Sequence, residues 1–137
     1  MGGQGRKTER GAAAVEFALI LPLLMVILFG TIDWGFYFFV QQIVNNAARE
    51  GARVGSLTVP GTPGADAIAK EQAEAQARTY LSAAGLRGTA SVDAVVTGTF
   101  VQVTVSYPTG SLTGFDWKGL TSLYPRNAWA QSQMANN

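Results

Sequence analysis

The chain has 137 residues, of which 14% are charged and 47% hydrophobic, whereas charged residues make up about 25% of a typical soluble domain. Ten Lys and Arg nearly balance nine Asp and Glu, so no strong net charge recruits nucleic acid. Cys and His are both missing from the sequence, which argues against disulfides, thiol nucleophiles, imidazole catalysis and most zinc sites. We therefore expect a protein that is not an enzyme, with no catalytic residues, cofactor, metal or small-molecule substrate.

An uncharged apolar segment near the N-terminus predicts a membrane span. Residues 17–32, FALILPLLMVILFGTI, lie between Glu16 and Asp33 and carry no charge. In a helix this core covers about 24 Å, and its apolar flanks extend it past the roughly 30 Å of bilayer hydrocarbon. We place the span at about 15–40, within a long N-terminal helix over 12–57.

The flanks of this segment indicate its orientation. Arg6, Lys7 and Arg10 precede it, so the positive-inside rule keeps the N-terminus cytoplasmic and translocates the rest to the periplasm or the exterior. An aromatic cluster at 34–39 marks the outer interface. A secretory signal peptide is the alternative, but the apolar segment is too long for one, and no small-x-small cleavage site precedes the cluster.

The start of the span resembles a prepilin-type processing site. A basic leader ends at Gly11, and Glu16 is the fifth residue counted from Ala12. The longer string RGAAAVEFALILPLLMVILFGTIDWG, followed by VQQIVNNAAREGAR, is similar to the TadE-like family, the minor pseudopilins of tight-adherence (Flp-type) pili. This resemblance covers residues 10–55. It implies a pilin-like subunit of the bacterial inner membrane, whose leader 1–11 a prepilin peptidase removes between Gly11 and Ala12.

The two acids that bound the span call for an explanation, because a carboxylate at the bilayer centre costs about 2.5–3.5 kcal/mol. The resemblance implies that Glu16 pairs with an α-amino group exposed by leader removal, its own or a neighbouring subunit's, during subunit docking. The alternative is an acid at the inner interface, stabilised by the positive end of the helix dipole. Asp33 is expected to lie at the outer interface and to need no special partner.

Pro22 falls inside the span and removes one backbone hydrogen bond, so we expect a kink or local unwinding there. Transmembrane helices tolerate such a proline. The kink either lets the helix adjust between membrane and filament or has no role.

Small residues recur at every fourth position beyond the span, at Ala47, Gly51 and Gly55. Such a stripe allows another backbone to approach closely. We favour packing against the protein's own sheet over a contact with another subunit.

Residues 58–137 predict a small α+β domain. After a break at 59–64, residues 65–85 read as a helix with Thr62 as N-cap, Pro63 in the first turn and Gly85 at the end. Its predicted apolar stripe consists of Ile68, Ala69, Ala73, Ala77, Tyr80, Leu81 and Ala84. Alternating residues then predict a hairpin over 89–97 and 99–107 and a last strand over 126–134, giving a three-stranded antiparallel sheet.

The long connection 108–125 is a candidate contact surface, since loops of this length are usually functional or disordered. Phe115 and Trp117 either contact a partner or fold back over the sheet. The resulting prediction is a pseudopilin that starts, caps or decorates a pilus. Its partners would be the inner membrane, the prepilin peptidase, other pilins or pseudopilins and the assembly platform. The alternative is an uncleaved single-span protein whose outer domain binds a secretion-machinery component or a surface ligand.

Overall fold

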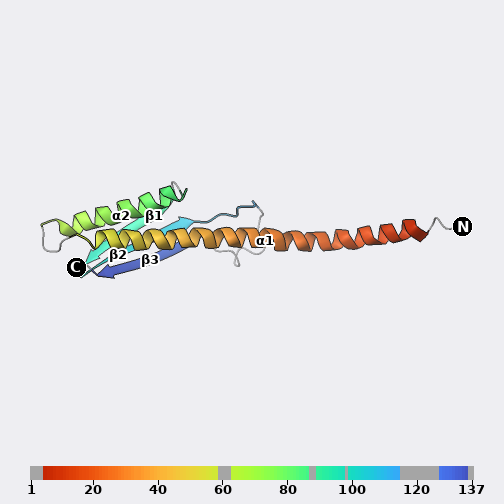
Figure 1. The fold of residues 1–137 in the computed structure, drawn as a ribbon, viewed down its shortest axis with the longest axis horizontal. Helices are drawn as coiled ribbons and strands as arrows, with labels where there is room; N and C mark the ends of the chain where they lie inside the picture. The colour runs from red at the N-terminus through yellow and green to blue at the C-terminus, as the bar shows by residue number, and fades with distance from the viewer. Residues whose placement is uncertain (1–4, 59–62, 87–88, 98, 115–126, 136–137) are drawn as a thin grey trace.

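The computed structural model describes residues 5–58, 63–86, 89–97, 99–114 and 127–135, and for residues 5–10 the backbone alone. The elements in chain order are α1 (Gly5–Gly55), α2 (Ala65–Ala83), β1 (Ser91–Thr97), β2 (Phe100–Pro108) and β3 (Asn127–Ala135). Figure 1 shows α1 as a long rod whose C-terminal half is covered by α2 and the sheet, while its N-terminal half extends away from them. The predicted α+β class, with a long N-terminal helix and an antiparallel sheet, is confirmed.

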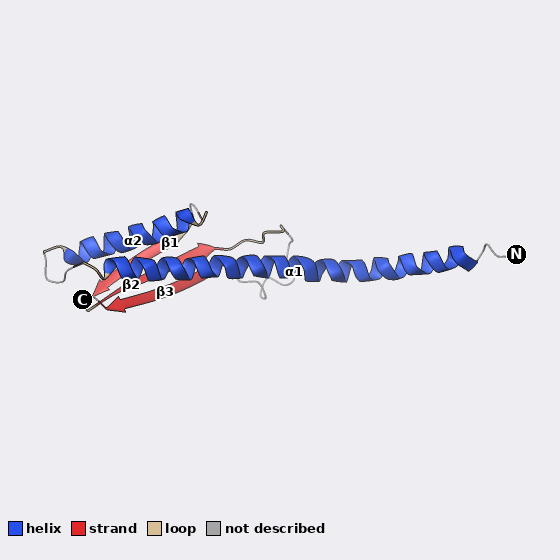
Figure 2. Cartoon of the chain, viewed as in Figure 1, coloured by secondary structure: helices blue, strands red, loops and turns tan. Residues whose placement is uncertain are grey.

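Helix α1 is continuous over 51 residues, from Gly5 to Gly55. It begins within the predicted leader, so residues 5–11 of that leader share one helix with the span (Figure 2). The chain stays α-helical through Pro22, and the predicted local unwinding therefore does not occur. A bend at this proline stays a prediction.

The sheet has the order β1-β2-β3 with both pairs antiparallel. The register places Ala94 and Ser132 on either side of Val103 in β2. Alternate residues are buried against the two helices, as the period-two pattern predicts. The buried members are Val92, Ala94, Val101, Val103, Val105, Ala128 and Ala130.

The small-residue stripe of α1 lies against the protein's own α2 and sheet. Ala47 is fully buried. A Cβ atom built on Gly51 would lie 2.8 Å from the carbonyl oxygen of Ala73. One built on Gly55 would lie 2.9 Å from both Ala73 Cβ and Val101 Cγ1. The two glycines therefore allow α2 and β2 to approach the backbone of α1 more closely than any larger residue would.

Helix α2 meets α1 through every fourth residue. Its buried positions are Ala65, Ala69, Ala73, Ala77 and Leu81. The predicted stripe is wrong for Ile68, which is exposed because it lies beside this narrower row, while Tyr80 and Ala84 are half-buried. The helix begins only at Ala65, after Gly64 with a positive φ of 80° and without a side-chain cap. Thr62, the predicted N-cap, lies outside the described residues.

The C-terminus of α2 is the one predicted. Gly85 has φ +85°, a conformation that favours glycine, and the amide of Leu86 donates to the carbonyl of Leu81 over 2.9 Å. Together they close the helix in the manner of a Schellman motif.

Side chains from the two helices bind both edges of the sheet. On β3, the Gln41 Nε2 donates to the carbonyl of Trp129 (2.8 Å) and the Trp129 amide donates to Gln41 Oε1 (3.2 Å). On β1, Arg78 donates to the carbonyl of Val92 (3.2 Å). The Ala94 amide of the same strand donates to Glu74 on α2 (3.3 Å). At these residues the backbone groups of the edge strands are already hydrogen-bonded within the chain, which disfavours pairing with a strand from another chain.

Candidate functional site

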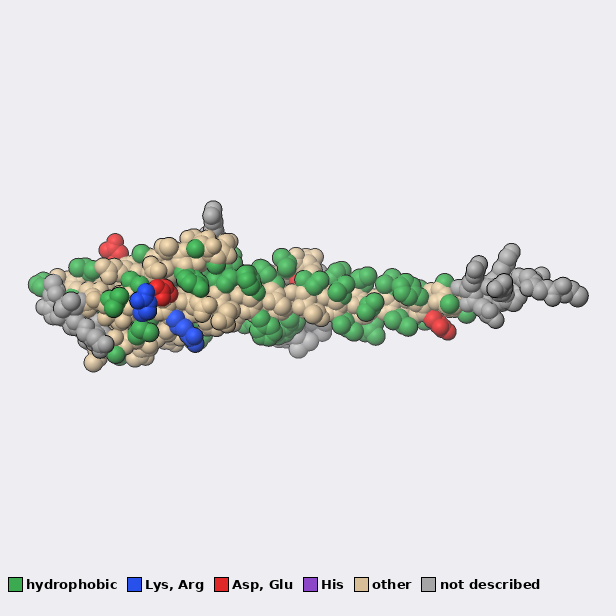
Figure 3. Space-filling view, in the orientation of Figure 1, with side chains coloured by type: hydrophobic (Ala, Val, Ile, Leu, Met, Phe, Trp, Pro, Cys, Tyr) green, Lys and Arg blue, Asp and Glu red, His purple; other side chains and the backbone are tan. Residues whose placement is uncertain are grey.

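The N-terminal half of α1 is an exposed apolar rod. The helix is long and apolar enough to cross a membrane, and none of its most apolar window is buried. Figure 3 shows hydrophobic side chains distributed along this part of the molecule. Its large exposed residues include Val15, Phe17, Leu19, Ile20, Leu23, Leu24, Ile27, Leu28 and Ile32. Because a soluble monomer rarely exposes such a surface, the rod requires lipid or other apolar helices around it.

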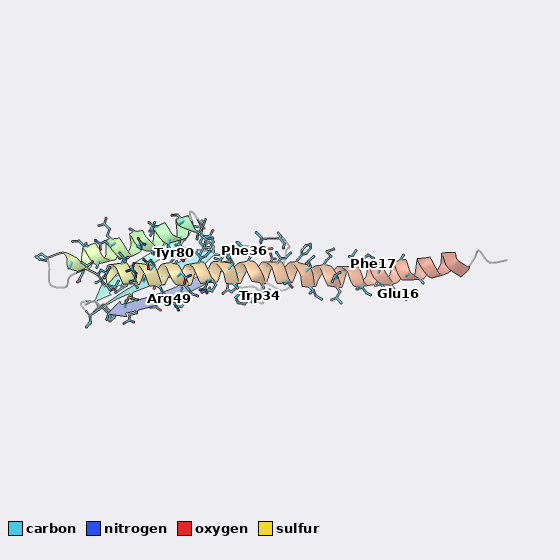
Figure 4. All side chains as sticks on the ribbon, viewed as in Figure 1. Glu16, Phe17, Trp34, Phe36, Arg49 and Tyr80 are labelled. Atoms are coloured by element: carbon cyan, nitrogen blue, oxygen red, sulfur yellow. The ribbon has the colours of Figure 1, made fainter. Side chains whose placement is uncertain are left out.

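The predicted processing and docking residues lie on this rod, far from the domain. Gly11, Ala12 and Glu16 are helical and exposed, and a Cβ on Gly11 would meet no atom within 4 Å. Figure 4 shows Glu16 and Phe17 on the bare part of α1. Among the described side chains, Glu16 has no hydrogen-bond or ion-pair partner, so its carboxylate is open to a group from outside the chain.

At the opposite end of the apolar segment, Asp33 is fully buried and extensively hydrogen-bonded. Its Oδ1 accepts hydrogen bonds from the amides of Leu112 and Thr113, both at 3.0 Å. Its Oδ2 accepts from the hydroxyls of Ser111 (2.7 Å) and Thr113 (3.0 Å). The expectation that Asp33 needs no special partner is therefore wrong: four donors from the segment after β2 surround the carboxylate.

The sequence does hold a signal for this contact. An acid at the edge of an apolar helix needs donors, and PTGSLTG, residues 108–114, is a turn-forming segment with hydroxyl side chains. Gly114 completes the turn with φ +69°. The two segments are separated by about 80 positions in the chain, and no periodic pattern links them.

A group of aromatic side chains lies on α1 where the domain begins. The ring of Trp34 packs edge-on against Tyr37 (centroids 5.9 Å apart) and lies 5.7 Å from the ring of Phe38. Trp34, Phe38 and Phe39 are exposed, and Figure 4 places Trp34 where the bare rod meets the domain. This position suits an interfacial belt. Phe115 and Trp117, the predicted contact residues, lie outside the described part of the chain.

Beyond the belt, α1 carries the exposed Arg49 and Arg53 and the half-buried Glu50. Arg53 binds Glu50 through two contacts, Nη2–Oε1 at 2.6 Å and Nε–Oε2 at 3.0 Å. The hydrogen bond from Arg53 lowers the pKa of Glu50 from its ordinary 4.5, and Glu50 in turn raises the pKa of Arg53. In the described ranges no three Asp or Glu side chains gather as a metal site would require.

An apolar helix long enough to cross a membrane, with a small α+β domain packed on its C-terminal half, indicates a single-pass, membrane-anchored protein. Within this class, the family described as TadE-like protein matches residues 11–53, which confirms the predicted resemblance over this part of the chain. The family is structural and not enzymatic. No curated protein and no solved structure matches the chain.

Proposed function

We propose that this protein is a pseudopilin of a tight-adherence pilus. It is inserted in the inner membrane with its N-terminus in the cytoplasm, is processed between Gly11 and Ala12 by a prepilin peptidase, and starts, caps or decorates the pilus. The observation that carries this proposal is the exposed apolar half of α1, near whose N-terminal end Glu16 has no partner among the described side chains. The family match over 11–53 covers this surface.

The exposed rod gives the subunit its mode of assembly. Its aliphatic side chains are solvated by lipid before assembly and pack against the helices of other subunits afterwards. The two edge strands contribute less to assembly, because their backbones are already hydrogen-bonded within the chain. Gln41 binds the backbone of Trp129 in β3, and side chains of α2 bind the backbone of β1. Association through helices leaves the fold of the outer domain unchanged.

Glu16 supplies the polar contact in this assembly. Once the leader is removed, the new α-amino group belongs to Ala12, and residues four apart on a helix are neighbours. The carboxylate therefore lies within one helical turn of its own chain's amine and is equally open to the amine of an adjacent subunit. Away from water, the attraction between the carboxylate and the amine is several times stronger than it is in water.

Processing also removes the charges that set the topology. The leader holds Arg6, Lys7, Arg10 and Glu9, so the mature chain keeps 7 basic and 8 acidic side chains (10 − 3 and 9 − 1). Cleavage therefore frees the helix from the cytoplasmic cluster that would oppose its movement out of the membrane.

The mass of the intact protein from its native host tests the proposal. We expect a chain that begins at Ala12, and a Gly11→Asp variant that keeps its leader and is absent from sheared surface filaments. Ala13→Ser, two residues away and equally exposed, is the control and should be processed normally. A wild-type chain that retains residues 1–11 beside an active peptidase would overturn the proposal in favour of the uncleaved single-span protein.

A further inference from the structure

We propose that residues 110–114 form a second contact with the lipid bilayer, at its outer surface, and that Asp33 holds them at that depth. This proposal goes beyond the role in the pilus and rests only on membrane anchoring by α1. Asp33 is a positioning residue here, because it acts through the segment that it binds.

The position of Asp33 along α1 sets the depth. Asp33 follows Glu16 by 17 residues, which corresponds to about 25 Å of helix, close to the thickness of the hydrocarbon layer. The amides of Leu112 and Thr113 lie 3.0 Å from the carboxylate, so residues 110–114 are fixed at the same level as Asp33. Figure 1 shows the chain after β2 running out from the domain toward the bare part of the rod.

Several large apolar side chains are exposed at this level. Leu112 is 59% exposed although its own amide is bound to a fully buried carboxylate. Ile32 and Trp34, on either side of Asp33, are 41% and 37% exposed. These exposed apolar side chains belong to Asp33's neighbours in α1 and to the loop residue whose amide binds Asp33, and a tryptophan at this position is typical of the membrane–water interface. The apolar character of this level favours lipid as the occupant.

The hydrogen bonds explain how a loop can enter this region. Backbone amides and hydroxyls that lose water near lipid are unfavourable unless they are bound within the protein. Asp33 accepts from two amides and two hydroxyls at once, and these four donors also satisfy the charge of the carboxylate. The arrangement lets Leu112 face lipid while the backbone around it stays hydrogen-bonded.

The absence of cysteine from the sequence allows a direct test with single labels. The full chain, carrying one environment-sensitive fluorophore, is placed in phosphatidylcholine vesicles whose lipids bear a nitroxide either near the headgroup or deep in the acyl chain. Leu112→Cys should be quenched more by the shallow nitroxide, and Ile20→Cys more by the deep one. Leu57→Cys, also exposed but at the far end of the domain, should be quenched by neither.

A second set of variants tests the role of Asp33. In the Leu112→Cys background, Asp33→Ala should reduce shallow quenching to the level of the Leu57 label, while Ile20→Cys keeps its deep quenching. Asp33→Asn keeps a carbonyl oxygen for the two amides and should retain most of the shallow quenching.

The outcomes separate this proposal from membrane anchoring itself. A water-exposed label at Leu112 beside a quenched label at Ile20 overturns the loop contact alone, and it points to a protein partner or solvent at Leu112. Unchanged shallow quenching in Asp33→Ala overturns the positioning role. An unquenched label at Ile20 overturns both the loop contact and the anchoring by α1.

Discussion

Thr113 donates two hydrogen bonds to Asp33, one from its amide to Oδ1 and one from its hydroxyl to Oδ2, each at 3.0 Å. Asp33 lies on α1 at the end of the uncharged apolar segment, and Thr113 lies in the connection that follows β2, so this pair joins the rod to the domain. Its loss should therefore affect the domain as well as the helix.

We expect Asp33→Ala to lower the free energy of unfolding by about 2–4 kcal/mol, because it leaves two amides and two hydroxyls without their charged acceptor. Asp33→Asn should cost less, since it keeps one acceptor oxygen. Thermal unfolding in detergent measures both. Glu71→Ala, an exposed acid on α2, is the control and should change stability by less than about 0.5 kcal/mol.

Glu16→Ala should insert and be processed but should fail to join other pilus subunits, because the mature amine loses its carboxylate. Glu16→Gln, which keeps the shape but not the charge, should fail in the same way, and Glu16→Asp should recover part of the assembly. The measurement is co-purification with pilus subunits at equal membrane abundance. Normal assembly of Glu16→Ala would leave Glu16 as a simple interfacial acid.

Gly51→Ala should destabilise the domain by about 1–3 kcal/mol through overpacking, since its new Cβ would lie 2.8 Å from the backbone oxygen of Ala73. Gly35→Ala is a matched control in the same helix, where a Cβ meets nothing within 4 Å. There the gain in helix propensity should stabilise the protein by about 0.5–1 kcal/mol. We expect the two substitutions to shift the thermal unfolding midpoint in opposite directions. Equal shifts would contradict the close approach of α2 to Gly51.

Gln41→Ala removes the two hydrogen bonds to the backbone of Trp129 at the edge of β3. We expect it to lower the free energy of unfolding by about 1 kcal/mol. Hydrogen exchange of the Trp129 amide should accelerate, while that of Val103, in the central strand β2, reports any global loss of stability. Exchange that rises equally at both amides would show general unfolding and contradict a local role for Gln41.

The ion pair of Glu50 and Arg53 predicts a pH dependence. Because the pKa of Glu50 is lowered in the folded state, the pair adds stability above the ordinary value of 4.5, and that contribution is lost as the pH falls through the folded pKa. The difference in stability between wild type and Glu50→Gln should be small at neutral pH, since the pair is exposed, and should vanish in acid. Denaturant titrations across this range measure it. A difference that grows in acid would be inconsistent with the pair.

The sequence was sufficient for features that depend on local patterns. Sixteen uncharged residues between Glu16 and Asp33 predicted the exposed rod, and alternation about Val101, Val103 and Val105 predicted the buried face of β2. The spacing of Gly51 and Gly55 predicted a close approach, because only a small residue tolerates it.

Contacts between distant segments could not be predicted in this way. Asp33 finds its donors some 80 positions later, and Gln41 binds Trp129 at a separation of 88. Neither of these pairs belongs to a periodic helix or strand pattern. Only the folded backbone brings the two residues of each pair together, so periodicity does not predict the contact. Ile68 was assigned to the buried stripe for a related reason: helical periodicity alone does not show how narrow a contact between alanine-rich helices becomes.

The continuity of α1 also has a mechanical consequence. Val40, Val44 and Ala48 of this helix are fully buried in the domain, and the same helix runs without interruption into the apolar rod. No hinge separates the two halves within Gly5–Gly55, so a pull along the rod is carried directly to the packed side chains beneath α2 and the sheet. Axial movement of the rod would therefore lift the domain with it, and rotation of the rod would turn the domain.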